Sequence, residues 1–217
     1  MTVTLFYALA FAADIAPDVA YALLAHFGSA QAIFAATPAQ LCAAQPTLTL
    51  EQAQRLLSAP VDEYATNIQG LSQQGYHTLY PYKDPYPHNL RKFTHPPLVL
   101  FARGKPIAAD IQSVAILGSS QPSPATLELA KQLGAGLADR GLTIVTSLNR
   151  GVDIAALRAA LDIGGRALGV LNHGLLAPPY PAEHADLLPD LAWQGAVLSP
   201  FKPKPPASAP NNPLRDA

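Results

Sequence analysis

From residue 111 onward, the sequence alternates short apolar runs with longer segments whose apolar residues recur at helical spacing. The apolar runs, which predict buried strands, are SVAILG (113–118), LTIVTS (142–147), RALGVL (166–171) and GAVLS (195–199). The helical segments between them are 123–141, 151–165 and 183–191. Near-continuous apolar strands separated by helices are typical of a parallel sheet covered by helices. The predicted fold class is therefore α/β, with a shortened, doubly wound, Rossmann-like parallel sheet.

The residues before this core predict a small helical module and a connector. Apolar residues recur every three or four positions through the first part of the chain, and a further helix is expected over 61–74. Thr37 before Pro38 fits an N-cap followed by proline, and Thr49 with Gln52 has the spacing of a capping box. The expected division is a helical module over 1–75, a connector and leading strand over 76–110, a Rossmann-like core over 111–200 and a flexible proline-rich tail over 201–217.

Charge is distributed unevenly along the chain. Residues 1–90 carry two basic and six acidic side chains, whereas residues 91–217 carry 12 basic and nine acidic ones. If the chain binds a polyanion, the second half is expected to bind it. The helical module is similar to SAM or helix-hairpin-helix modules, but its few cations favour packing or protein contact over DNA contact.

The composition excludes several classes of protein. With 49% hydrophobic and 13% charged residues, the chain can bury a sizeable core, so global disorder is excluded. One cysteine, Cys42, excludes a disulfide scaffold and a cysteine-rich zinc site. The apolar N-terminus lacks a basic region, because the first cation is Arg55, and no apolar run reaches the ~20 residues of a membrane span. The sequence therefore predicts a soluble, cytoplasmic protein that does not associate with membranes.

Three predicted loops follow the strands and combine glycine with small polar residues. Because the carboxyl ends of parallel strands meet at one edge of a sheet, these loops are expected to lie together. Glycine lets a ligand approach the backbone, and the amides of a helix N-terminus favour phosphate. Arg150 adds a charge that can bind phosphate in a bidentate manner. The candidate DNA- or phosphate-binding residues are Gly118, Ser119, Ser120, Ser147, Asn149, Arg150, Gly151, Asp153, Asn172, His173 and Gly174.

The same edge lacks the sequence patterns of an enzyme. There is no Gly-Lys-Ser/Thr phosphate loop, no G-x-S-x-G nucleophile turn and no pair of carboxylates placed as acid and base. The six histidines show no metal-binding spacing, and Gly134 with Gly136, which looks like part of a dinucleotide fingerprint, lies inside a predicted helix. Asp153, in the first turn of its helix, is expected to cap that helix rather than to contact a ligand. The sequence thus predicts binding without catalysis, metal or cofactor.

Several phrases of the sequence, taken in order, resemble the DNA-processing protein A family, the Smf/DprA proteins of bacterial transformation. They are LLAHFGSAQAIFAA, the connector YPHNLRKFTHPPLVLFARGK and the core phrases VAILGSS, GLTIVTSLNRGVDIAALRAAL, ALGVLNHGLLAPPYP and GAVLSPF. The family pattern runs approximately YPxxL…PPxxLFxxG, VAIVGSR, GxxIVSGxAxGID, a Val-Leu-x-x-Gly…YP segment and GxxxSE. The resemblance covers nearly the whole chain. Residues at matching motif positions are Gly118, Ser119, Arg150, Gly151 and Asp153.

The resemblance implies an extended Rossmann domain that binds single-stranded DNA in DNA uptake and recombination and helps to load a RecA-type recombinase. Phosphates would lie at the helix N-termini, so binding would weaken as salt rises. A possible additional basic patch consists of Arg91, Lys92, Arg103 and Lys105. Two other functions stay open: a Rossmann domain that senses a nucleotide or small anion, and a degenerate subunit that contacts proteins.

The sequence departs from the family pattern at positions that matter for binding. Ser120 stands where the family has the arginine of GSR, Leu157 where it has a histidine, and Ser199-Pro200 where it has Ser-Glu. These departures predict DNA binding that is weakened or dependent on a partner. A sheet that ended after the fourth predicted strand would leave an unpaired edge and an uncovered apolar helix face. A second copy of the chain or a DprA-like partner chain is expected to cover them.

Overall fold

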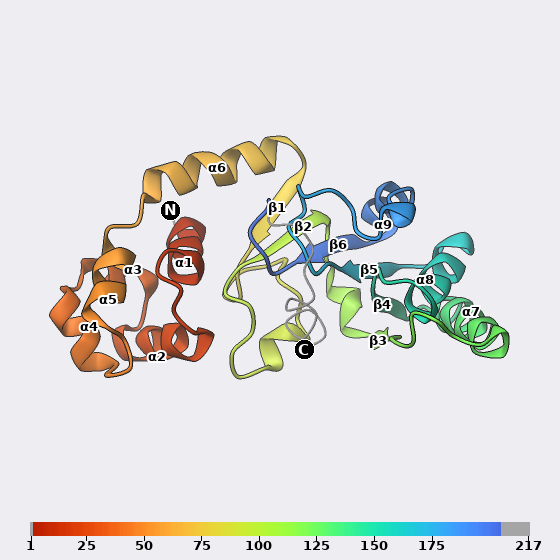
Figure 1. Cartoon of the computed structure of the whole chain (residues 1–217), viewed down its shortest axis with the longest axis horizontal. Helices are drawn as coiled ribbons and strands as arrows, with labels where there is room; N and C mark the ends of the chain where they lie inside the picture. Colours follow the sequence, from red (N-terminus) through yellow and green to blue (C-terminus); the bar gives the residue numbers. More distant parts are fainter. Residues whose placement is uncertain (1, 205–217) are drawn as a thin grey trace.

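Six strands form one sheet in the computed structural model, which describes residues 2–204. The strands are β1 (Tyr76–Leu79), β2 (Leu100–Gly104), β3 (Ser113–Ala115), β4 (Thr143–Ser147), β5 (Ala167–Val170) and β6 (Ala196–Ser199). Their order across the sheet is β1-β2-β6-β5-β4-β3. Strands β3 to β6 are parallel, whereas β2 runs antiparallel to both β1 and β6. Figure 1 shows the sheet in the middle of the molecule, between the N-terminal helices and the helices of the parallel core.

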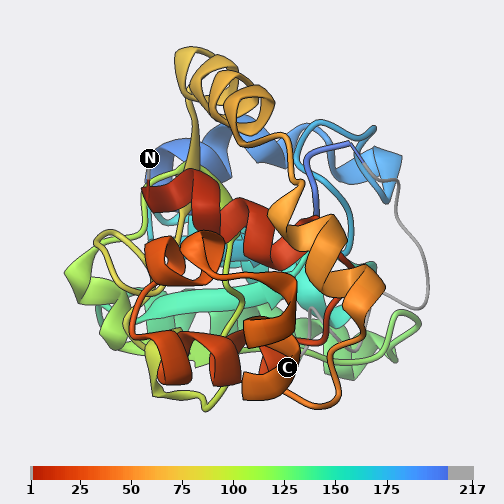
Figure 2. The ribbon, with the colours of Figure 1, turned by 90° about the vertical axis from the view of Figure 1, so that its left-hand side faces the viewer.

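Residues 2–73 form a helical module that packs on the sheet through β2. Its helices are α1 (Thr2–Phe11), α2 (Pro17–Phe27), α3 (Ala30–Ala35), α4 (Pro38–Ala44), α5 (Leu50–Leu57) and α6 (Val61–Gln73). Thr37 and Thr49 each make both hydrogen bonds of a capping box, so both predicted N-caps are confirmed. Phe101 of β2 is buried in the same apolar cluster as the helices. Figure 2 shows α1 to α5 in front of the sheet, with α6 above them.

The three long segments after residue 120 place their helices on one face of the sheet. These helices are α7 (Pro124–Ala138), α8 (Val152–Asp162) and α9 (Leu187–Gln194), and short 3-10 turns are η1 (Leu90–Lys92), η2 (Ala108–Ile111) and η3 (Ala182–His184). Ser123 caps α7 by accepting a hydrogen bond from the Thr126 N–H at 3.2 Å, as its position predicts. The parallel strands follow one another across the sheet in chain order, so right-handed connections keep all three helices on the same side.

The opposite face of the parallel strands carries no helix of this core. Ile144, Ala167 and Val197 point toward α7, α8 and α9, while the next residues along each strand point away. We call the second surface the helix-free face; its side chains include Val145, Leu168, Val170, Leu198 and Leu100. The predicted α/β class and Rossmann-like parallel core are confirmed. The N-terminal module and the connector, not a second layer of core helices, stand opposite this face.

Strand β6 is not an edge of the sheet, because β2 pairs with it. The register runs from Phe101 opposite Ser199 to Gly104 opposite Ala196. The expectation of an unpaired edge after the fourth predicted strand is therefore wrong: the connector fills that position and β1 extends the sheet further. The residues of the expected tail from 205 onward lie outside the described part of the chain.

A buried ion pair fastens the connector to the parallel core. Arg166 Nε donates to Asp110 Oδ1 at 2.6 Å, and Arg166 Nη2 donates to Asp110 Oδ2 at 2.9 Å. The Thr143 hydroxyl and the Ile107 N–H donate to the same carboxylate at 2.9 and 2.8 Å. Asp110 is 6% exposed. Because Arg166 precedes β5 and Thr143 begins β4, this carboxylate fixes η2 against the amino ends of two strands.

Candidate nucleic-acid interface

The loops after β3 and β4 meet at the carboxyl edge of the sheet. Gly151 lies so close to the first loop that a Cβ atom there would be 2.2 Å from the Ser119 carbonyl oxygen, and its φ of +79° also favours glycine. The Val152 N–H donates to the same oxygen at 3.1 Å. The structure therefore brings together the first two of the three loops that the sequence places at this edge.

Asp153 lies beneath this junction and holds the two loops together. Its Oδ1 accepts a hydrogen bond from the Gly118 N–H at 2.9 Å, and its Oδ2 accepts one from the Ser147 hydroxyl. Both Asp153 and Ser147 are 2% exposed. The structure thus differs from the expectation that Asp153 caps its own helix, because the carboxylate bridges the ends of β3 and β4. Both residues shape the interface from below, and neither lies on its surface.

Asp153→Ala is expected to lower the free energy of unfolding by about 2–3 kcal/mol, because the Gly118 N–H and the Ser147 hydroxyl lose an acceptor inside the protein. Urea denaturation measures the change. Asp162→Ala, at the exposed end of the same helix, serves as the control and should change stability by less than about 0.5 kcal/mol. Equal urea midpoints for Asp153→Ala and the wild type would show that this carboxylate does not hold the junction.

The third loop, after β5, is closed by the protein itself. Gly174 is buried, and a Cβ atom there would lie 2.2 Å from the carbonyl oxygens of both Lys202 and Pro203. Asn172 and His173 are 5% and 2% exposed. The segment after β6 therefore covers this loop. The structure does not place Asn172, His173 and Gly174 on the surface that the first two loops share.

The exposed part of the edge is smaller than the sequence suggests. Gly118, Ser119, Ser120 and Arg150 are exposed, and Asn149 and Gly151 are half-buried beside them. Two backbone amides expected to bind phosphate are used within the protein, since the Gly118 N–H bonds Asp153 and the Val152 N–H bonds Ser119. The groups that this surface offers to an anion therefore include the hydroxyls of Ser119 and Ser120 and the guanidinium of Arg150.

Arg150 forms a bidentate salt bridge with Glu183. Arg150 Nε donates to Glu183 Oε1 at 2.5 Å, and Arg150 Nη2 donates to Oε2 at 3.0 Å. The two side chains are 54% and 51% exposed. The hydrogen bond from Arg150 lowers the pKa of Glu183, and Glu183 in turn raises the pKa of Arg150, so both groups stay charged near neutral pH. Sequence reasoning missed Glu183, because 33 residues separate it from Arg150.

The possible basic patch lies at the other edge of the sheet. Its members, near the amino ends of the parallel strands, are Arg91, Lys92, Arg103 and Lys105. Gly104, between the last two, pairs with Ala196 at the start of β6. Asn89, just before the first two, donates to the Ser113 hydroxyl at the start of β3 at 3.3 Å. Because parallel strands begin at the edge opposite their carboxyl ends, these cations do not form one surface with Arg150.

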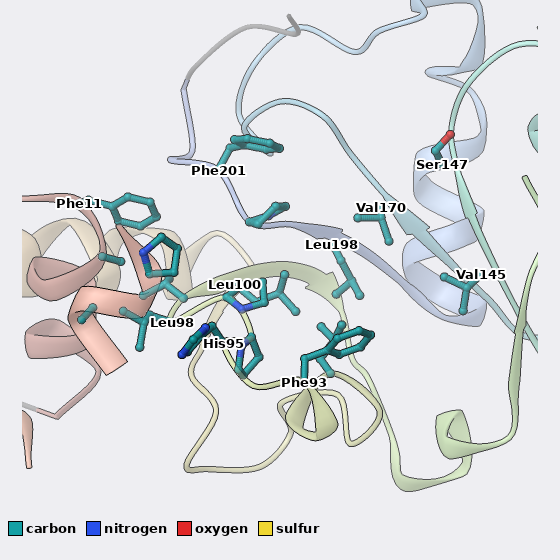
Figure 3. A pocket seen from close by; sticks show the side chains of 18 of the residues that line it. Phe11, Phe93, His95, Leu98, Leu100, Val145, Ser147, Val170, Leu198 and Phe201 are labelled. Atoms are coloured by element: carbon teal, nitrogen blue, oxygen red, sulfur yellow. The ribbon is translucent and has the colours of Figure 1, made fainter. Parts of the chain in front are cut away.

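A large apolar hollow opens on the helix-free face, and the sequence analysis missed it. Its volume is about 620 Å³. The side chains around it include Val145, Val170 and Leu198 from the sheet, Phe11 from α1, Phe93 and His95 from the connector and Phe201 from the segment after β6 (Figure 3). The sequence contains a signal for this hollow, because the predicted strands are apolar on both faces. When the strands follow one another across the sheet in chain order, the predicted helices cover only one of these faces.

Two further features of the described residues bear on the chemistry. No three His, Cys, Asp or Glu side chains within residues 2–204 are grouped so that they could hold a metal ion. Within the same residues, no helix is both long and apolar enough to cross a membrane.

Comparison with known proteins identifies relatives of this chain. The family model for DNA recombination-mediator protein A matches residues 77–217. Protein Smf of Escherichia coli is 35% identical over 173 residues, which are 79% of this chain and 46% of that protein. A putative DNA processing protein DprA of Mycobacterium tuberculosis is 31% identical over 156 residues, covering 66% of this chain and 40% of that protein. The chain thus spans less than half the length of these relatives.

Two solved structures are similar in fold. The X-ray structure of DNA processing protein A from Streptococcus pneumoniae has a TM-score of 0.82 at 21% identity and covers all of this chain and 73% of that one. DNA processing protein A from Helicobacter pylori, described by its single-stranded DNA binding mode, has a TM-score of 0.57 at 25% identity and covers 65% of this chain and 62% of that one. Since the family model matches well over half of its residues, the chain belongs to the DNA recombination-mediator protein A family.

Proposed function

We propose that this chain binds single-stranded DNA at the surface formed by Gly118, Ser119, Ser120, Asn149 and Arg150. Membership of the recombination-mediator family supports this function, and so does the likeness to the Helicobacter protein whose single-stranded DNA binding mode has been described. The observation that carries the proposal is the junction of the first two loops, which places Arg150 beside two exposed serine hydroxyls.

We propose a binder and not an enzyme, because the exposed groups of this surface can hold phosphate. Serine hydroxyls can donate to phosphate oxygens, and a guanidinium can bind a phosphate with two parallel N–H groups. Ser120 stands where the family pattern has arginine, so the surface has one phosphate-pairing cation fewer than the pattern. We therefore expect weak binding that falls steeply with salt. The chain would act in the cytoplasm on incoming strands, as a mediator that helps to load a RecA-type recombinase.

Arg150→Ala is expected to weaken binding to oligo-dT about ten-fold at low salt, because a charge-assisted contact to phosphate is lost. The slope of log affinity against log salt should also fall by about 0.7, since one phosphate fewer is neutralised on a single strand. Fluorescence anisotropy with labelled oligo-dT at several salt concentrations measures both quantities.

Arg158→Ala is the matched control for this experiment. Arg158 also makes a bidentate salt bridge, with Asp186, and its side chain is 42% exposed. Unlike Arg150, it lies in the second turn of α8, away from the loop junction. It should leave the affinity for oligo-dT within about two-fold of the wild type. A wild-type chain that shows no complex with oligo-dT at low salt would contradict the proposed function.

The apolar hollow supports a second candidate function, contact with another protein. The hollow of about 620 Å³ gathers apolar side chains, among them Val170, Leu198 and Phe201, and apolar surfaces of this kind can mark contact sites for other proteins. Its occupant would be a RecA-type recombinase, a DprA-like partner chain or a second copy of this chain. Light scattering after size exclusion, alone and with each candidate added, distinguishes these cases. A chain that stays monomeric and unbound in every mixture would contradict this second function.

A further inference from the structure

The cation at the loop junction, Arg150, is already bound to an anion of the protein. Arg150 uses Nε and Nη2 to hold both carboxylate oxygens of Glu183, at 2.5 and 3.0 Å. Nε and Nη2 form one of the two edges with which a guanidinium can bind phosphate in a bidentate manner. A phosphate oxygen cannot occupy the same positions unless the Glu183 side chain turns away. The free protein therefore presents Arg150 in a neutralised pair.

The backbone keeps Glu183 close to Arg150 even when the side chains separate. Glu183 lies in η3, and the next residue, His184, is 7% exposed and forms a hydrogen bond between its Nδ1 and the Leu148 carbonyl oxygen at 2.8 Å. Leu148 belongs to the same loop as Arg150. Because this buried contact fastens η3 to the loop, Glu183 competes with any incoming anion at a high local concentration.

We infer that Glu183 occupies Arg150 as a substitute for phosphate and thereby lowers the affinity of the proposed DNA surface for anions. A free nucleotide or inorganic phosphate must displace Glu183 and makes few other contacts that could compensate for the broken salt bridge. A strand can contact several groups at once, and the additional contacts to Ser119 and Ser120 compensate for the broken salt bridge. Glu183 therefore imposes the same modest cost on every anion, so a small anion with few contacts is left weakly bound while a strand with several contacts still binds. This inference rests on the proposed function for its DNA part only.

The pair Arg158–Asp186 provides a control within the same region. Arg158 Nη1 and Nη2 donate to the two Asp186 oxygens at 3.0 and 3.2 Å, and the two side chains are 42% and 59% exposed. Removing the Asp186 charge changes the net charge of this side of the protein by the same amount as removing that of Glu183. It does not release a cation at the loop junction, so it reports the general electrostatic effect alone.

The experiment compares the wild type with E183Q, D186N, R150A and the double variant R150A/E183Q. E183Q should bind oligo-dT about three- to five-fold more tightly than the wild type at low salt, because the released salt bridge is exposed and of modest strength. D186N should change the affinity by less than about two-fold. In the R150A background, the gain from E183Q should disappear, because no guanidinium is left to release.

A second measurement uses inorganic phosphate and does not depend on DNA binding. Millimolar phosphate should raise the unfolding midpoint of E183Q by about 2–4 °C and that of the wild type and D186N by less than half as much. R150A/E183Q should not respond more than R150A.

The outcomes separate this inference from the proposed function. If the wild type binds oligo-dT and E183Q binds it equally or more weakly, Glu183 positions Arg150 and the inference is overturned. If none of the variants binds DNA, the proposed function fails, and the phosphate measurement decides the role of Glu183. A phosphate response of E183Q then supports its control of Arg150, whereas no response overturns it.

Discussion

Asp110→Ala should lower the free energy of unfolding by about 3–5 kcal/mol, one of the two largest effects that we expect in this chain. The substitution leaves the Arg166 guanidinium partly buried without its carboxylate partner, and it also removes the acceptor of the Thr143 hydroxyl and the Ile107 N–H. Breaking a buried ion pair from one side costs this much because the remaining charge is not compensated. Urea denaturation at neutral pH, followed by circular dichroism, measures the change.

The control is Asp84→Ala, which removes an exposed partner of an arginine. Asp84 Oδ1 lies 2.7 Å from Arg91 Nη2, but the Asp84 side chain is 87% exposed. Surface ion pairs contribute little, so the change should be within about 1 kcal/mol. If the two variants lose equal stability, the connector is not fastened to the core by Asp110.

Acid should reduce the difference between the wild type and Asp110→Ala. Burial alone would raise the pKa of Asp110, but hydrogen bonds from Arg166, Ile107 and Thr143 outweigh burial and hold the pKa below its ordinary value. A carboxyl group whose folded-state pKa is lowered contributes stability that is fully present above its unfolded pKa, about 3.9, and is lost as pH falls through the folded-state pKa. The urea midpoints of the wild type and Asp110→Ala should therefore move closer together as the pH falls below about 3.9, compared with their separation at neutral pH.

Much of the fold could be predicted because its signals are local. Thr37, Thr49 and Ser123 each begin a helix within a few residues of the group that they cap, and the structure has the helices where these caps predict them. The apolar runs that predict β4, β5 and β6 do form strands in the structure. The run 113–118 is only partly a strand, since β3 ends at Ala115. The Ile116 N–H still donates to the Val145 carbonyl oxygen, and the chain then turns toward Asp153.

The pairing of β2 with β6 could not be read from the sequence. Phe101 and its partner Ser199 are 98 positions apart along the chain, and an apolar strand carries no information about which edge it joins. The same reason explains why the edge after β6 was expected to be open. Pairing by the connector also leaves the helix-free face with the N-terminal module opposite it, which is how the apolar hollow arises.

The candidate site was predicted in its location but not in its detailed chemistry. Strand order alone places the glycine-containing loops at the carboxyl edge. Which amides stay available depends on contacts between distant residues, such as Asp153 with Gly118, 35 residues away, and Arg150 with Glu183. From its place in the sequence, Asp153 looks like a group at the ligand-binding loop. In the folded protein its carboxylate instead accepts hydrogen bonds from the loop's own Gly118 N–H and from the Ser147 hydroxyl.

Gly134 and Gly136 also differ through contacts that the sequence does not reveal. A substitution at Gly134 gives the second of the two largest stability changes that we expect. The two glycines lie in α7, as the sequence predicts, so they are not part of a dinucleotide-binding turn. Their surroundings differ. A Cβ atom at Gly134 would lie 2.2 Å from the Ala156 carbonyl oxygen and 2.8 Å from the Ala156 Cα, both backbone atoms of α8. At Gly136 the nearest atom is Arg140 Nη1 at 3.7 Å, an ordinary contact with a flexible side chain.

Gly134→Ala is therefore expected to destabilise the protein by about 3 kcal/mol or more, because α7 and α8 must move apart and lose packing along their whole contact. Gly136→Ala, two residues away in the same helix, should stabilise it by about 0.5–1 kcal/mol, since alanine restricts the unfolded chain and fits a helix better. The two substitutions add the same methyl group, so intrinsic helix propensity cancels in their comparison. Urea midpoints that move in the same direction would mean that α7 and α8 do not meet backbone to backbone at Gly134.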